Sequence, residues 1–472
     1  MVFSSPVFLF YFLPVLIILY FLAPKKAKNY VLILFSLVFY AWGEPVFVGI
    51  MLVSAVIDYT VGRLIDYDIR KHGKKYAKYF LLISIFANLG ILTVFKYADF
   101  LIGSFNGVFG TSVPLTNLPL PIGISFYTFQ TMSYSIDVCR GEVKAQKNFA
   151  NLLLYTTLFP QLVAGPIVRY STIETQIQNR QVTFDKFSDG VVRFIVGLSK
   201  KVLIANQMAV IADGIFAIAP SEAAILTSWL GVAAYTLQIY FDFSGYSDMA
   251  IGLGKMFGFD FLENFNYPYI SCSITEFWRR WHISLGTWFK DYLYFPLGGS
   301  RVSKAKHIRN LLIVWALTGL WHGASWNYLV WGLFMFVFIV IEKYVVKVPK
   351  KYSLIRNVIT MLLIMVGWVI FRSDTLSGAA LYIKNMFCFG NRALTDYDTV
   401  YYFTDKYREI TAAVICALPI LPLIKKVYSN IQNRPARIAI GLCQTVFLTA
   451  MFALCTVSLI NQTYNPFIYF KF

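Results

Sequence analysis

Long apolar runs separated by short polar stretches dominate the sequence from one end to the other. A membrane-spanning helix needs about 20 mostly apolar residues, and fewer where other protein surrounds it. By this measure the candidate spans are residues 6–23, 30–42, 46–64, 79–97, 119–137, 149–165, 188–210, 222–243, 245–259, 308–321, 323–342, 354–371, 410–424 and 437–460. Because several are short or interrupted by Gly and Pro, we expect about 11–13 transmembrane helices, with re-entrant segments among the rest. The pattern predicts an all-α, polytopic integral membrane protein.

No internal repeat or low-complexity linker divides these runs. We therefore expect a single transmembrane domain over residues 1–460, followed by a short aromatic tail at residues 461–472. Clusters of Lys and Arg alternate with loops that carry few cations, and such clusters mark the cytoplasmic side of a membrane protein. This alternation places residues 261–309 in the cytoplasm, and it places residues 373–409 and the tail outside.

Composition agrees with a membrane location. The chain is 58% hydrophobic and 14% charged, with a mean hydropathy of +0.60, whereas soluble domains carry about 25% charged residues. The net charge of +18 would suit a nucleic-acid partner, but the cations lie in short clusters between apolar runs, so we expect contact with membrane lipid and no nucleic acid. The six cysteines form no CxxC pair, so neither a disulfide framework nor a metal site is indicated.

Residues 276–291 (EFWRRWHISLGTWFKD) show a second kind of pattern. On a helical wheel the aromatic residues fall on one face and the charged residues on the other. This predicts a single amphipathic helix lying in the cytoplasmic interface of the membrane. His282 lies at the border of the two faces, where a structural role and a catalytic role both remain open.

Two further polar or broken stretches interrupt the apolar runs. Residues 238–248 place two carboxylates and several hydroxyls at the end of a hydrophobic run, which is typical of a helix end facing an aqueous cavity or of hydrogen-bonded helix contacts. Residues 159–170 (FPQLVAGPIVRY) hold two prolines and a glycine in an apolar setting. This second stretch predicts a broken, re-entrant segment that lines a cavity.

His322 is the most informative single residue, because the sequence around it is apolar on both sides. Ionisable groups are costly inside a membrane and are usually kept for function, and His transfers protons near neutral pH. Two classes fit these facts: an enzyme that uses His322 as general base, with His282 as a second candidate, and a transporter in which the same His relays protons. Transporters often show paired interrupted helices in two halves. No such symmetry is seen here, which favours the enzyme.

Four stretches resemble the membrane-bound O-acyltransferase (MBOAT) family, and within it the membrane subunits that serve O-acetylation of alginate, cellulose and peptidoglycan. They are residues 159–170, 240–251 (YFDFSGYSDMAI), 276–301 and 320–332 (LWHGASWNYLVWG). The D-alanyl transferase of teichoic acids is a sister branch of the same family. The resemblance covers nearly the whole chain and implies a ring of membrane helices around a thin centre, with a funnel that reaches a buried His.

The resemblance also implies a function. His322 matches the catalytic His of the family, and His282 matches its second characteristic polar position. The implied donor is acetyl-CoA in the cytoplasm, with no bound cofactor. The implied acceptor is an extracytoplasmic hydroxyl on a partner of the SGNH hydrolase-like type, so that an extracytoplasmic polysaccharide becomes O-acetylated at the bacterial inner membrane. A transporter and a D-alanyl transferase are the alternatives. The cations of residues 279–309 would attract the phosphates of coenzyme A or anchor the topology, and we prefer the second interpretation.

The aromatic tail at residues 467–472 (FIYFKF) suggests an interfacial belt by composition alone. It also resembles the C-terminal motif of the small membrane peptide that accompanies the D-alanyl transferase, in which a tyrosine is assigned the role of acyl carrier. Carried over here, that position is Tyr469, whose phenol would attack the thioester with His322 as base. Phenoxide (pKa about 10) leaves more easily than an alkoxide, so the aryl ester would be a good acyl donor. Carrier and membrane anchor both remain open for the tail.

Overall fold

The computed structural model describes residues 1–346, 349–388, 393–461, 465 and 468. Throughout these residues the regular structure is helical and no strand occurs. The chain divides into two compact units: one comprises residues 1–194 and 249–262, and the other comprises residues 195–248 and 263–472. Two long helices, α10 (Phe184–Ser199) and α12 (Ile225–Met256), contribute residues to both units.

The other helices of the first unit precede α10. They are η1 (Phe8–Phe12), α1 (Leu13–Leu22), α2 (Lys28–Ala41), α3 (Val48–His72), α4 (Ala77–Leu92), η2 (Thr93–Tyr97), α5 (Ala98–Phe109), α6 (Ile124–Arg140), α7 (Phe149–Thr157), α8 (Phe159–Leu162) and α9 (Tyr170–Asn179).

The second unit holds the remaining helices. They are η3 (Lys200–Ala205), α11 (Asn206–Phe216), η4 (Pro268–Ile270), α13 (Ile274–Arg280), α14 (Ile283–Phe289), η5 (Lys290–Tyr294), α15 (Lys304–His322), α16 (Trp326–Tyr344), η6 (Lys350–Tyr352), α17 (Ser353–Arg372), α18 (Leu376–Met386), α19 (Tyr397–Ala417), α20 (Ile420–Ser429) and α21 (Arg434–Asn461).

Several of these helices are long and apolar enough to cross a membrane. Among the described residues they number six: Val48–His72, Ala77–Phe109, Phe184–Phe216, Trp326–Tyr344, Ser353–Arg372 and Arg434–Asn461. Two shorter apolar helical stretches, Phe8–Leu22 and Lys28–Ala41, precede them. The expected all-α, polytopic class is thereby confirmed, while the count of 11–13 crossings and the single-domain boundary stay predictions.

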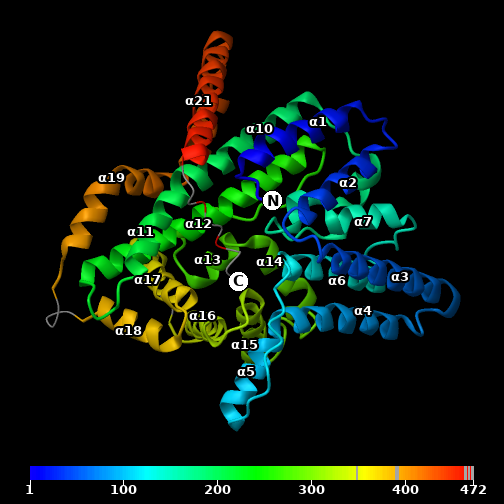
Figure 1. Cartoon of the computed structure of the whole chain (residues 1–472), viewed down its shortest axis with the longest axis horizontal. Coiled ribbons are helices and arrows are strands. Elements are labelled where there is room, and N and C mark those ends of the chain that lie inside the picture. Colours follow the sequence, from blue (N-terminus) through cyan, green and yellow to red (C-terminus); the bar gives the residue numbers. More distant parts are fainter. Residues whose placement is uncertain (347–348, 389–392, 462–464, 466–467, 469–472) are drawn as a thin grey trace. The chain divides into compact units, whose positions relative to one another are not determined.

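In the first unit α3, α4 and α6 lie side by side around a buried carboxylate (Figure 1). Asp58 of α3 is fully buried and accepts hydrogen bonds from Ser84 and Asn88 of α4 and from Ser135 of α6. A buried polar group is costly unless it is hydrogen-bonded. This network therefore fixes how the three helices pack together.

The predicted break in residues 159–170 is present. Helix α8 ends at Leu162, and residues 163–169 leave helical structure while most of them stay buried. At Gly165 a Cβ atom would lie 2.5 Å from the carbonyl oxygen of Pro160, so only glycine fits this tight turn. Irregular backbone inside a membrane protein is tolerated where other protein covers it, as it is here.

For residues 238–248 the sequence left open a helix end or hydrogen-bonded helix contacts. The stretch lies inside α12, so it is not a helix end, and its carboxylates contact a neighbouring helix. Its carboxylates are matched by cations of η3: Lys201 lies 2.8 Å from Asp242, and Lys200 lies 2.6 Å from Asp248. A Cβ atom on Gly245 would meet the carbonyl oxygen of Gly197 at 2.8 Å. Close backbone approach and paired charges allow α12 to continue through a stretch that looks like a terminus in the sequence.

The predicted single amphipathic helix over residues 276–291 is wrong. Helix α13 ends at Arg280, and α14 begins at Ile283. The gap is held by the preceding loop: the Asn266 N–H donates to the Arg280 carbonyl at 2.9 Å, and the Ile283 N–H donates to the Asn264 carbonyl at 3.0 Å. These long-range bonds replace helical ones, so the chain turns between the two helices.

Candidate active site

His322 is the last residue of α15, at the start of the short turn that leads into α16. The two helices pack with their backbones almost in contact, since a Cβ atom on Gly319 would lie 2.3 Å from the Tyr328 carbonyl and one on Gly332 would lie 2.3 Å from the Trp315 carbonyl. Small residues at these positions permit this hairpin. The hairpin in turn fixes the position of the His322 backbone.

Aromatic rings surround the imidazole of His322, which is only 6% exposed. The rings of Trp321, Trp331 and Phe371 approach it edge-on, with centroid distances of 5.1, 5.2 and 5.2 Å. They come from α15, α16 and α17 and are all buried. An aromatic wall of this kind limits the rotation of the ring and keeps bulk water away from it.

His282 occupies the break between α13 and α14, not the edge of an amphipathic helix as the sequence suggested. Its backbone is left-handed, with φ 45° and ψ 53°, a conformation in which His is several-fold enriched among non-glycine residues. The side chain is 3% exposed and packs edge-on against Phe243 at 4.6 Å. The turn thus directs this imidazole into the protein interior.

Asn264 fixes the tautomer of His282. The Ser284 backbone N–H, which can only donate, points to Oδ1 of Asn264 at 3.2 Å, while Nδ2 of Asn264 donates to Ser247 Oγ at 3.1 Å. The same Oδ1 lies 3.2 Å from Nδ1 of His282, so Nδ1 must carry the proton and donate. A neutral His282 therefore presents Nε2 as its basic nitrogen.

Both imidazoles line one cavity of about 420 Å³, which we term the histidine cavity. Apolar and aromatic side chains form most of its wall, among them Trp278, Trp281 and Trp315. Burial, together with the nearby His322, lowers the pKa of His282 well below its ordinary value. An apolar cavity of this size with two convergent imidazoles has the usual form of a small-molecule site.

The structure places the two predicted histidines on one cavity, and the sequence prediction did not include Asn264 and Ser247. Neither residue belongs to a sequence pattern that indicates catalysis, and the contact from Asn264 to His282 spans 18 residues of chain.

Among the residues that the structure describes, no group of three or more His, Cys, Asp or Glu side chains could hold a metal ion.

The C-terminal tail contacts this unit at two described residues. The Ile468 N–H donates to Oδ2 of Asp242 at 2.8 Å, and Nδ2 of Asn206 donates to Oδ1 of Asn465 at 3.2 Å. Ile468 is 4% exposed and belongs to the same hydrophobic cluster as Trp331 and other walls of the site. Tyr469, the predicted acyl carrier, lies outside the described residues.

Comparison with known proteins identifies the family of the chain. The family model for membrane-bound O-acyltransferases matches residues 46–372. The chain is 40% identical to "Probable alginate O-acetylase AlgI" of Azotobacter vinelandii, over 100% of both chains. It is 34% identical to a peptidoglycan O-acetyltransferase of Helicobacter pylori, over 82% of this chain and 80% of the relative. A teichoic acid D-alanyltransferase of Bacillus subtilis is 30% identical over 55% of this chain and 70% of its own. The chain thus belongs to the membrane-bound O-acyltransferase family and is a multi-pass O-acyltransferase.

Proposed function

We propose that this O-acyltransferase takes an acetyl group from acetyl-CoA in the cytoplasm and passes it across the bacterial inner membrane for O-acetylation of an extracytoplasmic polysaccharide. The convergence of His282 and His322 on one apolar cavity carries the proposal. Relatives named for O-acetylation of alginate and of peptidoglycan match this chain over most or all of its length, which favours acetyl over other acyl groups. The acceptor is a cell-surface polymer of the alginate, cellulose or peptidoglycan kind.

His322 acts as the general base. It removes the proton of the attacking hydroxyl while the oxygen bonds to the thioester carbonyl carbon; the carbon–sulfur bond then breaks, and the proton passes to the departing thiolate. Proton transfer by a positioned side chain contributes about 10²–10⁴-fold in rate. The aromatic packing of His322 and its fixed helix terminus supply that positioning.

His282 supports this reaction from the wall of the same cavity. With Nδ1 donating to Asn264, a neutral His282 offers Nε2 as an acceptor for a donor group of the substrate other than the attacking hydroxyl, whose single proton goes to His322. Because its pKa is lowered, His282 stays neutral and does not place a positive charge beside the substrate. We assign His282 the role of orienting the substrate, and His322 the transfer of the proton.

Tyr469 is the first acceptor in this scheme, and its acetyl ester then serves an SGNH hydrolase-like partner outside the membrane. The anchoring of the neighbouring Ile468 on Asp242 supports this role, since it holds the chain beside Tyr469 against the unit that contains both histidines. An aryl ester is activated relative to an alkyl ester because phenoxide is the better leaving group.

The test uses the purified full chain in detergent with ¹⁴C-labelled acetyl-CoA and no partner. Mass spectrometry of the C-terminal peptide should show an acetyl group on Tyr469, and Tyr469→Phe should abolish labelling while it keeps wild-type membrane levels. Labelling from a D-alanyl thioester and none from acetyl-CoA would instead assign the chain to the D-alanyl branch. Labelling of the Tyr469→Phe chain at the wild-type level would reduce the tail to an anchor.

A further inference from the structure

Acyl transfer in the histidine cavity needs a hydrogen-bond donor in addition to a base. When the hydroxyl oxygen bonds to the thioester carbon, an electron pair of the carbonyl bond moves onto the carbonyl oxygen, which becomes an oxyanion. Fixed donors aimed at that oxygen usually supply the largest single part of the rate enhancement. Neither histidine supplies this donor, because His322 takes up the proton of the hydroxyl and the Nδ1 proton of His282 is committed to Asn264.

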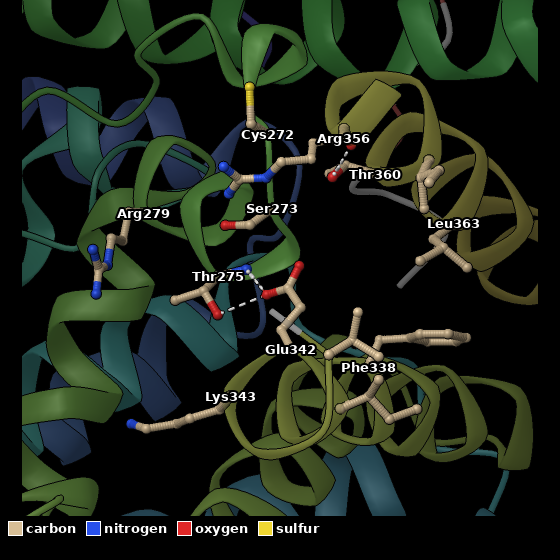
Figure 2. A pocket seen from close by; sticks show the side chains of 13 residues that line it. Cys272, Ser273, Thr275, Arg279, Phe338, Glu342, Lys343, Arg356, Thr360 and Leu363 are labelled. Carbon is tan, nitrogen blue, oxygen red and sulfur yellow. Dashed lines mark hydrogen bonds between the residues drawn. The ribbon is translucent and has the colours of Figure 1, made fainter. Parts of the chain in front are cut away.

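The threonine hydroxyls in the wall of this cavity already have acceptors. Thr275 donates to the carboxylate of Glu342, as a dashed line in Figure 2 shows. Thr287 and Thr318 donate to backbone carbonyl oxygens one turn earlier in the chain, at 2.7 and 2.8 Å. These hydroxyls would have to leave their acceptors to reach an oxyanion.

Other polar side chains of the wall are also poor candidates. The Tyr294 hydroxyl lies 2.8 Å from Nε2 of His307. Arg279 and Lys290 are exposed. A donor stabilises an oxyanion most where water is excluded, so we looked for one in the aromatic part of the wall.

Trp278 of α13 offers a donor of this kind. Its ring lines the histidine cavity, and its indole nitrogen is buried and makes no hydrogen bond to any of the described residues. An indole N–H can only donate. A buried donor without an acceptor lowers stability, so its presence calls for an explanation such as a catalytic role.

The ring of Trp278 is held in place by four aromatic rings that meet it edge-on. They are Phe277, Trp315, Trp331 and Trp368, at centroid distances of 5.1, 5.1, 5.4 and 6.2 Å. Trp331 also packs against His322 at 5.2 Å. One ring therefore contacts both the base and this indole, and a donor fixed in this way stabilises an oxyanion without reorganisation.

We propose that the indole N–H of Trp278 donates a hydrogen bond to the carbonyl oxygen of the thioester and stabilises the oxyanion that forms there. As the intermediate collapses, the electron pair returns to the carbonyl bond, the carbon–sulfur bond breaks, and the thiolate takes the proton from His322. The assignment rests on the proposed function for the thioester chemistry.

The experiment measures kcat for acyl transfer by the purified full chain with acetyl-CoA and with fluoroacetyl-CoA. Trp278→Phe keeps an aromatic ring and removes the N–H, so kcat with acetyl-CoA should fall about 10²–10³-fold, as it does for other single oxyanion donors. The loss should be smaller with fluoroacetyl-CoA, because fluorine withdraws charge from the oxyanion and reduces its need for a donor. Trp368→Phe is the matched control and should keep the wild-type kcat, because this ring packs against Trp278 without lining the cavity.

The two donors also separate loss of the N–H from distortion of the site. Distortion would lower kcat equally with both donors, so an equal loss in Trp278→Phe would overturn the assignment, as would a wild-type kcat. Trp281 lines the same cavity, and a larger loss in Trp281→Phe than in Trp278→Phe would place the donor on Trp281 instead. A wild-type chain that accepts neither coenzyme A thioester would contradict the proposed function, and the same comparison would then use the plain and fluorinated thioesters of the carrier that it does accept.

Discussion

The backbone N–H of Ile468 donates a hydrogen bond to the carboxylate of Asp242, which also forms a buried ion pair with Lys201 at 2.8 Å. Asp242 and Lys201 are 2% and 3% exposed at their side chains. A carboxylate buried in the middle of a long helix thus has two partners: a cation that offsets its burial, and the C-terminal tail. The ion pair therefore serves as the docking point of the tail.

Asp242 variants test this docking. Asp242→Ala leaves Lys201 charged and buried without its partner, and breaking a buried pair in this way costs about 3–5 kcal/mol. We expect a clear fall in Tm. The double variant Lys201→Met/Asp242→Leu should recover much of the Tm, because apolar residues often replace a buried pair at little cost. It should still lose acetyl transfer, and recovery of transfer would show that tail docking is not required.

His282→Asn separates chemistry from backbone strain. The left-handed backbone at this position suits Asn as well as His, so the turn between α13 and α14 should persist. We expect a Tm close to wild type and a loss of kcat of at least about tenfold, since the imidazole is gone. His282→Ala should lose both stability and activity. Wild-type kcat in His282→Asn would remove His282 from the reaction.

Asn264 is predicted to act as a positioning residue through the tautomer of His282. Asn264→Ala removes the acceptor for Nδ1 and also the partner of the Ser284 N–H. We expect kcat to fall about tenfold while the KM for the donor stays unchanged. Asn264→Asp keeps an acceptor at this position and should restore part of kcat, with an altered pH profile. A change in KM alone would contradict the positioning role.

Asp396 gives a prediction for pH. It begins α19 and, although partial burial raises its pKa, hydrogen bonds from Thr227, Thr399 and the Ala224 N–H lower it to about 2. A carboxyl whose folded pKa is depressed contributes stability above its ordinary pKa of 3.8 and loses it as the pH falls toward 2. We expect Tm, measured in steps from pH 5 to pH 2, to fall less for Asp396→Asn than for the wild type. An equal fall in Tm for the variant and the wild type would contradict this role of Asp396.

Much of the site could be predicted from the sequence because its signal is local. His322 stands out since both flanks are apolar, and the candidate spans 308–321 and 323–342 meet at it. The break at residues 159–170 could also be predicted, because Pro and Gly interrupt a helix wherever they occur together.

The features that could not be predicted depend on distant contacts. The periodicity of residues 276–291 is that of one helix, and only the bonds to Asn264 and Asn266 divide it at His282. Likewise, Asp242 and Asp248 suggest a helix end in the sequence. The structure shows that they pair with Lys200 and Lys201 inside a continuous helix. Asn264 carries no sequence signal, because its role is defined entirely by what it contacts.

The most direct measurement places the purified chain in liposomes with ¹⁴C-labelled acetyl-CoA inside and the SGNH hydrolase-like partner outside. The account predicts that label appears on the outside acceptor with the wild type and disappears with His322→Ala, while the variant inserts at the same level. His322→Gln, which keeps a polar side chain of similar size, should also fail because it cannot take up a proton. Transfer of label by His322→Ala at a substantial fraction of the wild-type rate would contradict the central claim.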